Sequence, residues 1–153
     1  MRIKIMGECE SARALRGLLR RAGFAVTEFL PSAAVLGPQA GYVITIEETD
    51  SSGWIHLDSV DSELEAAILR HITQLSPHPV SVDRPGGLVH SERELGIALP
   101  AGDAVQAQAV EFGVLRGLLE LAGPKEVETF QRSNVPTFKR EPKRGWWRRL
   151  WAR

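Results

Sequence analysis

The single cysteine of the chain, Cys9, lies where a thiol could act as a nucleophile. It follows a short β-rich run over residues 2–6, and a helix is expected to begin at Ser11, so the thiol would lie close to a helix N-terminus. The carboxylates of Glu8 and Glu10 disfavour a thiolate there, and neither a second cysteine nor a serine follows at the spacing of thioredoxin-like proteins. We therefore interpret Cys9 as a small, partly buried structural residue.

The same stretch, KIMGECESARALRGLL, has the order strand, glycine, helix start that dinucleotide-binding folds use to hold phosphate. That motif needs two further glycines, but Cys9 and Ala12 occupy their positions after Gly7. Glu8 and Glu10 would also repel phosphate from the helix terminus that should attract it. The residues therefore predict no phosphate site of this kind.

Two loops are expected at the carboxyl ends of strands, where ligands of α/β sheets bind: GECES over residues 7–11 and RPGGLVHSERE over residues 84–94. A small-ligand, nucleotide-like enzyme or sensor built on these loops is our alternative functional hypothesis. The candidate ligand contacts in these loops are Cys9, Arg84, Gly86, Gly87, His90 and Glu92. Convergence of Cys9, His90 and Glu92 on one pocket would favour this hypothesis.

Metal binding is not indicated by the histidines. His56 and Asp58 would share one face of a strand, and His90 lies four residues before Glu94, but neither pair recurs at ligand spacing. His71 borders the apolar face of its expected helix, which indicates packing. We predict no metal, no cofactor and no catalytic residue.

The elements that position these residues follow from hydrophobic periodicity and capping signals. Strands are expected over residues 2–6, 24–29 and 79–84, with a hairpin over residues 42–60. Helices are expected over residues 11–22, 62–75 and 103–122, with a short helix after Ser91. The order β-α-β-β-β-α-β-α predicts a single α/β domain with a mixed sheet, and it resembles Rossmann-like or thioredoxin-like folds.

Two glycines stand out in the last of these helices. Gly113 and Gly117 form a ridge of small residues that permits close approach by another element, either within the chain or in a dimer. The related stretches LRGLLRRAG, from Leu15, and LRGLLELAG, from Leu115, differ in their flanks, so we interpret their likeness as coincidence.

Composition and charge set the class of protein. With 43% hydrophobic and 25% charged residues, the chain matches ordinary globular usage. It has neither a long uninterrupted apolar run nor a secretory signal pattern, and one cysteine suits a reducing compartment, so we expect a cytoplasmic protein. The formal net charge of zero hides an asymmetry: residues 139–153 carry seven basic side chains against one acidic, and the rest of the chain has a net charge of −6.

The C-terminus is therefore expected to work apart from the folded domain. We divide the chain into an α/β domain over residues 1–123, a polar, proline-containing linker over 124–143 and a basic, Trp-rich tail over 144–153. As a helix, the tail would gather its apolar residues within an arc of about 140°, away from its arginines. The residues expected to bind through this tail are Trp146, Trp147, Arg148, Arg149, Leu150 and Trp151.

Three destinations for the tail stay open. Docking on a partner protein, a second subunit or the chain's own acidic domain comes first, and an anionic membrane surface comes second. Single-stranded nucleic acid comes third, because the domain itself is acidic. We therefore expect a non-enzymatic intracellular binding or adaptor protein.

Overall fold

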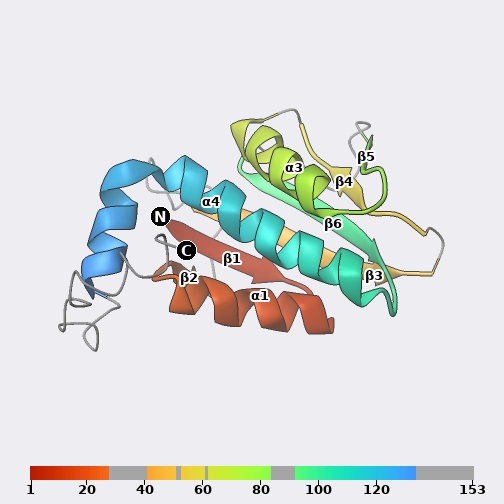
Figure 1. The fold of residues 1–153 in the computed structure, drawn as a ribbon, viewed down its shortest axis with the longest axis horizontal. Helices are drawn as coiled ribbons and strands as arrows, with labels where there is room; N and C mark the ends of the chain where they lie inside the picture. Colours follow the sequence, from red (N-terminus) through yellow and green to blue (C-terminus); the bar gives the residue numbers. More distant parts are fainter. Residues whose placement is uncertain (28–40, 51–52, 61, 84–91, 134–153) are drawn as a thin grey trace, which may run out of the picture.

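A six-stranded mixed sheet with three helices packed on it forms the part of the chain that the computed structural model describes, residues 1–27, 41–50, 53–60, 62–83 and 92–133 (Figure 1). The expected single α/β domain with a mixed sheet is thus confirmed. The strands are β1 Arg2–Met6, β2 Ala25–Thr27, β3 Tyr42–Thr49, β4 His56–Asp58, β5 Ser81–Asp83 and β6 Glu94–Pro100. The helices are α1 Glu10–Arg21, α3 Glu63–Leu75 and α4 Ala104–Ser133.

The strand order across the sheet is β2-β1-β3-β6-β4-β5. The first four of these strands run parallel to one another. β4 runs antiparallel to β6, and β5 pairs parallel with β4, so the last two strands point the other way. As a result, Asp83 at the end of β5 and Glu94 at the start of β6 both lie toward the amino end of the parallel strands, not their carboxyl end.

Two expectations about these strands are wrong. The predicted hairpin over residues 42–60 does not form, because β6 lies between β3 and β4 and pairs with both. The short helix expected after Ser91 is replaced, from Glu94 onward, by strand β6. Its buried residues Leu95, Ile97 and Leu99 alternate with residues that face the opposite side, a period of two that outweighs the helix-capping signal.

Helices α3 and α4 begin where their capping residues predict, whereas α1 begins at Glu10, before the expected Ser11 and without a side-chain cap at Cys9. Ser62 Oγ accepts a hydrogen bond of 3.2 Å from the backbone N–H of Glu65, which starts α3. Asp103 Oδ1 accepts one of 3.1 Å from the N–H of Gln106 and starts α4. Within α4, Gly123 has φ of 77° and interrupts the helix, and helical backbone continues beyond it to Ser133. Residues 124–133, the first part of the expected linker, therefore have helical backbone.

The three described helices lie on one face of the sheet. α4 packs between α1 and α3, and its contact with α3 is the most extensive between any two elements (Figure 1). The fully buried strand residues, such as Ile3, Ile44 and Leu95, form one core with these helices. A doubly wound Rossmann-like sheet carries helices on both faces, whereas no described helix covers the second face here. Parallel strands are normally covered on both faces of their sheet.

The glycine ridge of α4 is used inside the domain. A Cβ at Gly113 would collide with Cγ1 of Ile72, and one at Gly117 would lie 2.7 Å from Cγ1 of Ile68. Both isoleucines belong to α3 and are fully buried. The ridge therefore permits close packing of two helices of one chain, and the alternative of a dimer contact at these glycines is wrong.

Candidate functional site

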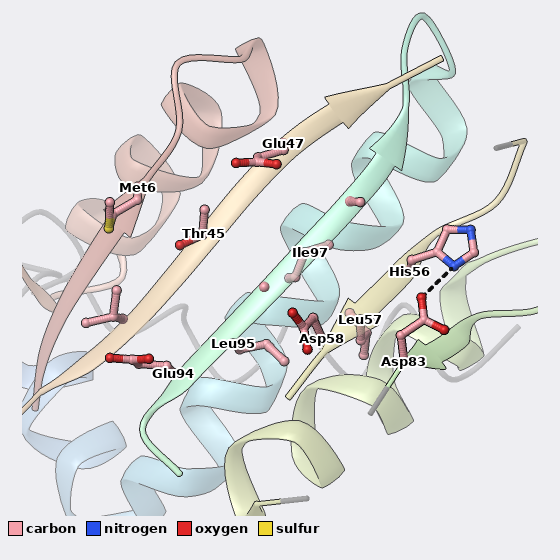
Figure 2. A pocket seen from close by; sticks show the side chains of 13 residues that line it. Met6, Thr45, Glu47, His56, Leu57, Asp58, Asp83, Glu94, Leu95 and Ile97 are labelled. Atoms are coloured by element: carbon pink, nitrogen blue, oxygen red, sulfur yellow. Dashed lines mark ion pairs between the residues drawn. The ribbon is translucent and has the colours of Figure 1, made fainter. Parts of the chain in front are cut away.

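A cavity of about 660 Å³ opens on the face of the sheet that no described helix covers (Figure 2). Five strands contribute to it, with β6 at its centre. On β6, the residues that point away from the core are Glu94, Gly96 and Ala98, because the intervening residues are buried under the helices. We call this cavity the β6 groove.

The register of the strands explains why the sheet is hollow here. Gly96 has Thr45 beside it on β3 and Asp58 beside it on β4. Ala98, two residues further along the same face, lies between Glu47 and His56 in the same way. Neighbouring strands are about 4.8 Å apart, so the two rows of larger side chains stand about 10 Å apart over a floor of glycine and alanine.

The groove is acidic. Its lining includes four carboxylates and neither lysine nor arginine; the four are Glu47, Asp58, Asp83 and Glu94. Within the described part of the chain, neither Glu47 nor Asp58 has an ion-pair or hydrogen-bond partner. The groove thus presents negative charge from both of its sides.

A histidine stands at the outer edge of this groove. His56 Nδ1 lies 3.5 Å from Oδ2 of Asp83, and Figure 2 shows the two side chains facing each other while Asp58 points toward β6. The side chain of Asp83 is 67% exposed, so this contact is largely solvated. The expectation that His56 and Asp58 share a strand face is confirmed. No group of three or more His, Cys, Asp or Glu side chains could hold a metal ion within the described ranges.

Apolar groups complete the surface on the β1 side of the groove. Met6 is 42% exposed and stands beside Thr45 across the β1–β3 pair, and half-buried Val43 lies one step along the same face. Figure 2 shows Met6 and Thr45 projecting on the same side of the sheet as Glu47. The site therefore combines an apolar patch with an acidic rim.

A second hollow, of about 360 Å³, lies at the carboxyl ends of β3 and β6, beside the N-termini of α1 and α4. Ligands of α/β sheets usually bind at this edge. Here the lining carries the carboxylates of Glu10, Glu48, Asp103 and Glu111. Desolvation raises the pKa of Glu111, and the side chain of Gln106 lowers that of Asp103. Four acidic groups would repel the anionic ligands that helix N-termini otherwise attract.

The β1–α1 loop beside this hollow is held by its own chain. Gly7 has φ of 119°, and a Cβ there would collide with the carbonyl oxygen of Ile46, so only glycine fits. Arg16 Nη2 donates hydrogen bonds of 3.1 and 2.6 Å to the carbonyls of Ile5 and Gly7. Arg13 Nη2 donates one of 2.7 Å to the carbonyl of Glu8. These arginines hold the loop, so their donors are already engaged by backbone.

The structure does not bring together the two expected ligand residues that it describes. Cys9 is the N-terminal flanking residue of α1, is half-buried against the core, and donates from Sγ to the carbonyl of Ile46 at 3.6 Å. Glu92 lies in the turn before β6, at the amino end of the parallel strands and so at the opposite edge of the sheet. The small-ligand alternative itself stays a prediction, because its other residues are not among those described. Arg84, Gly86, Gly87 and His90, together with all six tail residues, lie outside the described residues.

The groove residues were mostly missed by reasoning from the sequence. The missing signal is the alternation in residues 94–100, where small or acidic residues alternate with buried aliphatic ones. An interpretation of this run as a strand would have placed Glu94, Gly96 and Ala98 on one face. It would not have supplied their neighbours Thr45 and Asp58, which come from other parts of the chain.

Comparisons of the chain with protein-family models, with characterised proteins and with solved structures found no match. Within the described ranges, none of the helices is long and apolar enough to span a membrane. The groove itself, with its position, shape and charge, is therefore the basis for inferring function.

Proposed function

We propose that this protein is a non-enzymatic binding or adaptor protein that holds a basic, aromatic-containing peptide segment in the β6 groove. The observation that carries this proposal is the hollow over Gly96 and Ala98, lined by four carboxylates and no basic side chain. It lies on the face of a largely parallel sheet that no described helix covers.

The shape of the groove favours a peptide segment recognised through its side chains. β6 is paired on both sides, so its backbone cannot accept another strand, and an added strand is excluded at this site. The distance of about 10 Å between the rows of β3 and β4 matches the width of a helix or of one extended segment with its side chains. Recognition must therefore come from charge and apolar contact.

The energetics require both kinds of contact. Glu47 is exposed and Asp58 half-buried, and ion pairs at such positions contribute only about 0.2–1 kcal/mol each. Charge alone would leave binding weak and sensitive to salt. An aromatic side chain buries about 150–250 Å² and can pack on the patch around Met6 and Val43. A segment with arginine and tryptophan side by side meets both requirements.

A binding titration tests the proposal on a chain ending at Lys143, which lacks the chain's own basic, Trp-rich tail. The probe is a fluorescently labelled decapeptide of alternating arginine and tryptophan, followed by anisotropy at low and high salt. We expect Glu47→Gln/Asp58→Asn to weaken binding about tenfold, which corresponds to about 1.4 kcal/mol. The matched control, Glu8→Gln/Glu63→Gln, removes the same charge outside the groove lining and should leave binding unchanged.

Two further probes separate the contributions. Replacing each arginine of the peptide by glutamate should abolish binding, and replacing each tryptophan by alanine should weaken it strongly. Equal loss of affinity in the groove variant and in the control variant would show that only net charge matters. That result would reject the groove as the binding site.

A further inference from the structure

We infer that the segment that occupies the β6 groove in the free protein is the chain's own tail, residues 144–153, which acts as an intramolecular competitor of the partner. This inference rests on the function proposed above. It makes the protein autoinhibited: a partner segment must displace the tail to bind. Charge, composition and chain length support it independently.

The charges of the two surfaces are opposite. Residues 139–153 have a net charge of +6, and the remainder of the chain has −6. Four of the acidic side chains line the groove, with Glu47 and Asp58 flanking its floor. Because these two carboxylates have no partner among the described residues, arginines of the tail would gain ion pairs there without breaking any that the described residues make.

The composition of the tail matches the rest of the groove. Trp146, Trp147 and Trp151 lie among four arginines within ten residues, so apolar and cationic groups alternate over a short distance. The groove has the complementary order, with the patch around Met6 beside an acidic rim. Tryptophan and arginine are also the side chains that most often dominate binding energy at protein interfaces.

The chain is long enough for this contact. α4 follows the carboxyl end of β6 and packs back across the sheet, so its last turns lie near the amino end of β1 (Figure 1). Residues 134–143 separate Ser133 from the tail and can span about 35 Å when extended. A domain of this size has a radius of gyration of about 14 Å, so the segment can pass around an edge of the sheet. Glu94, at the amino end of β6, lies at the end of the groove that such a path reaches first.

Intramolecular attachment makes even weak complementarity sufficient. A short linker holds a tethered ligand at an effective concentration in the millimolar range. A tail that binds as a free peptide with micromolar affinity would then fill the groove almost completely. Removing the tail should therefore raise the apparent affinity for any competing segment.

Tryptophan fluorescence tests the inference on the full-length chain. In Trp54→Phe, which replaces a half-exposed residue outside the tail, the three remaining tryptophans all report on the tail. We expect Glu47→Gln/Asp58→Asn in this background to shift the emission to longer wavelength and at least double the acrylamide quenching constant. The control Glu8→Gln/Glu63→Gln should change neither, and circular dichroism should show equal folding.

Competition provides the second measurement. A chain ending at Lys143 should bind the arginine–tryptophan decapeptide at least tenfold more tightly than the full chain. The shortened chain could bind the probe through the groove while the emission of the tail tryptophans in the full chain is unchanged by the groove substitutions. That result would overturn the intramolecular inference and leave the proposed function standing. If neither chain binds the probe and the groove substitutions leave tryptophan emission unchanged, both the intramolecular inference and the proposed function are overturned.

Two other results would also overturn the inference. The tail tryptophans could be protected from acrylamide only at concentrations where sedimentation shows a dimer. That result would assign the groove to the tail of a second copy. The full chain could also sediment with anionic liposomes only when the tail is present, while tryptophan emission is unchanged by the groove substitutions. That result would assign the tail to a membrane surface.

Discussion

The close approach of α4 to α3 at Gly117 predicts that Gly117→Ala destabilises the domain, although alanine is the better helix former. A Cβ at Gly117 would lie 2.7 Å from Cγ1, 2.9 Å from Cα and 3.0 Å from the backbone nitrogen of Ile68. Ordinary carbon contacts are about 3.5–4.0 Å, so α3 and α4 would have to separate by about 1 Å. Two of these three atoms are backbone and cannot rotate away.

The magnitude follows from two opposing effects. Alanine gains about 1 kcal/mol of helix propensity over glycine. Overpacking of a buried contact costs about 1–3 kcal/mol, and the upper end applies here because Ile68 is fully buried in the core. We expect a net loss of about 2 kcal/mol in the free energy of unfolding and a fall in Tm of roughly 8 °C.

Gly17→Ala in α1 is the matched control. There the nearest atom to a new Cβ is the mobile Arg21 Nη1, at an ordinary 3.5 Å. This variant should gain about 1 kcal/mol from propensity alone. Urea unfolding and thermal melts of the two variants should therefore move in opposite directions. Stabilisation by Gly117→Ala, or equal shifts in both variants, would refute the close packing of α3 against α4.

Further predictions concern polar groups of α4. Hydrogen bonds from His71 and Arg70 lower the pKa of Glu120, so the ionised carboxylate stabilises the fold above its unfolded pKa. Glu120→Gln should be destabilising near pH 7, and the deficit should shrink as pH falls below about 4 in urea unfolding. Desolvation raises the pKa of Glu111, so the ionised form opposes folding, and Glu111→Gln should stabilise at pH 7 with no gain in acid. Fully buried Gln106 donates from Nε2 to the carbonyl of Gly53 at 2.8 Å, so Gln106→Ala should cost about 1–3 kcal/mol in the same assay.

Local signals were sufficient for the starts of helices α3 and α4. Ser62 with Glu65 three residues later, and Asp103 before a long apolar run, mark helix starts through hydrogen bonds that close within one turn. The alternation in residues 42–49 likewise predicted β3. These elements depend on neighbours within a few residues, so composition and spacing along the chain determine them.

The order of the strands depends on distant partners and could not be obtained in this way. β6 pairs with residues about 50 positions earlier on β3 and about 40 positions earlier on β4. A capping pattern at Ser91 and Glu94 gave a plausible local alternative, which the buried Leu95, Ile97 and Leu99 outweighed only once the sheet had formed.

The charge distribution can likewise be obtained from the sequence, whereas the groove depends on tertiary structure. The sequence by itself determined that the domain is acidic and that its C-terminus is basic and rich in tryptophan. Only the tertiary structure decided that Glu47, Asp58 and Glu94 face one hollow over Gly96. The physical reason is that cross-strand register, not sequence spacing, sets which side chains stand about 5–10 Å apart on a sheet.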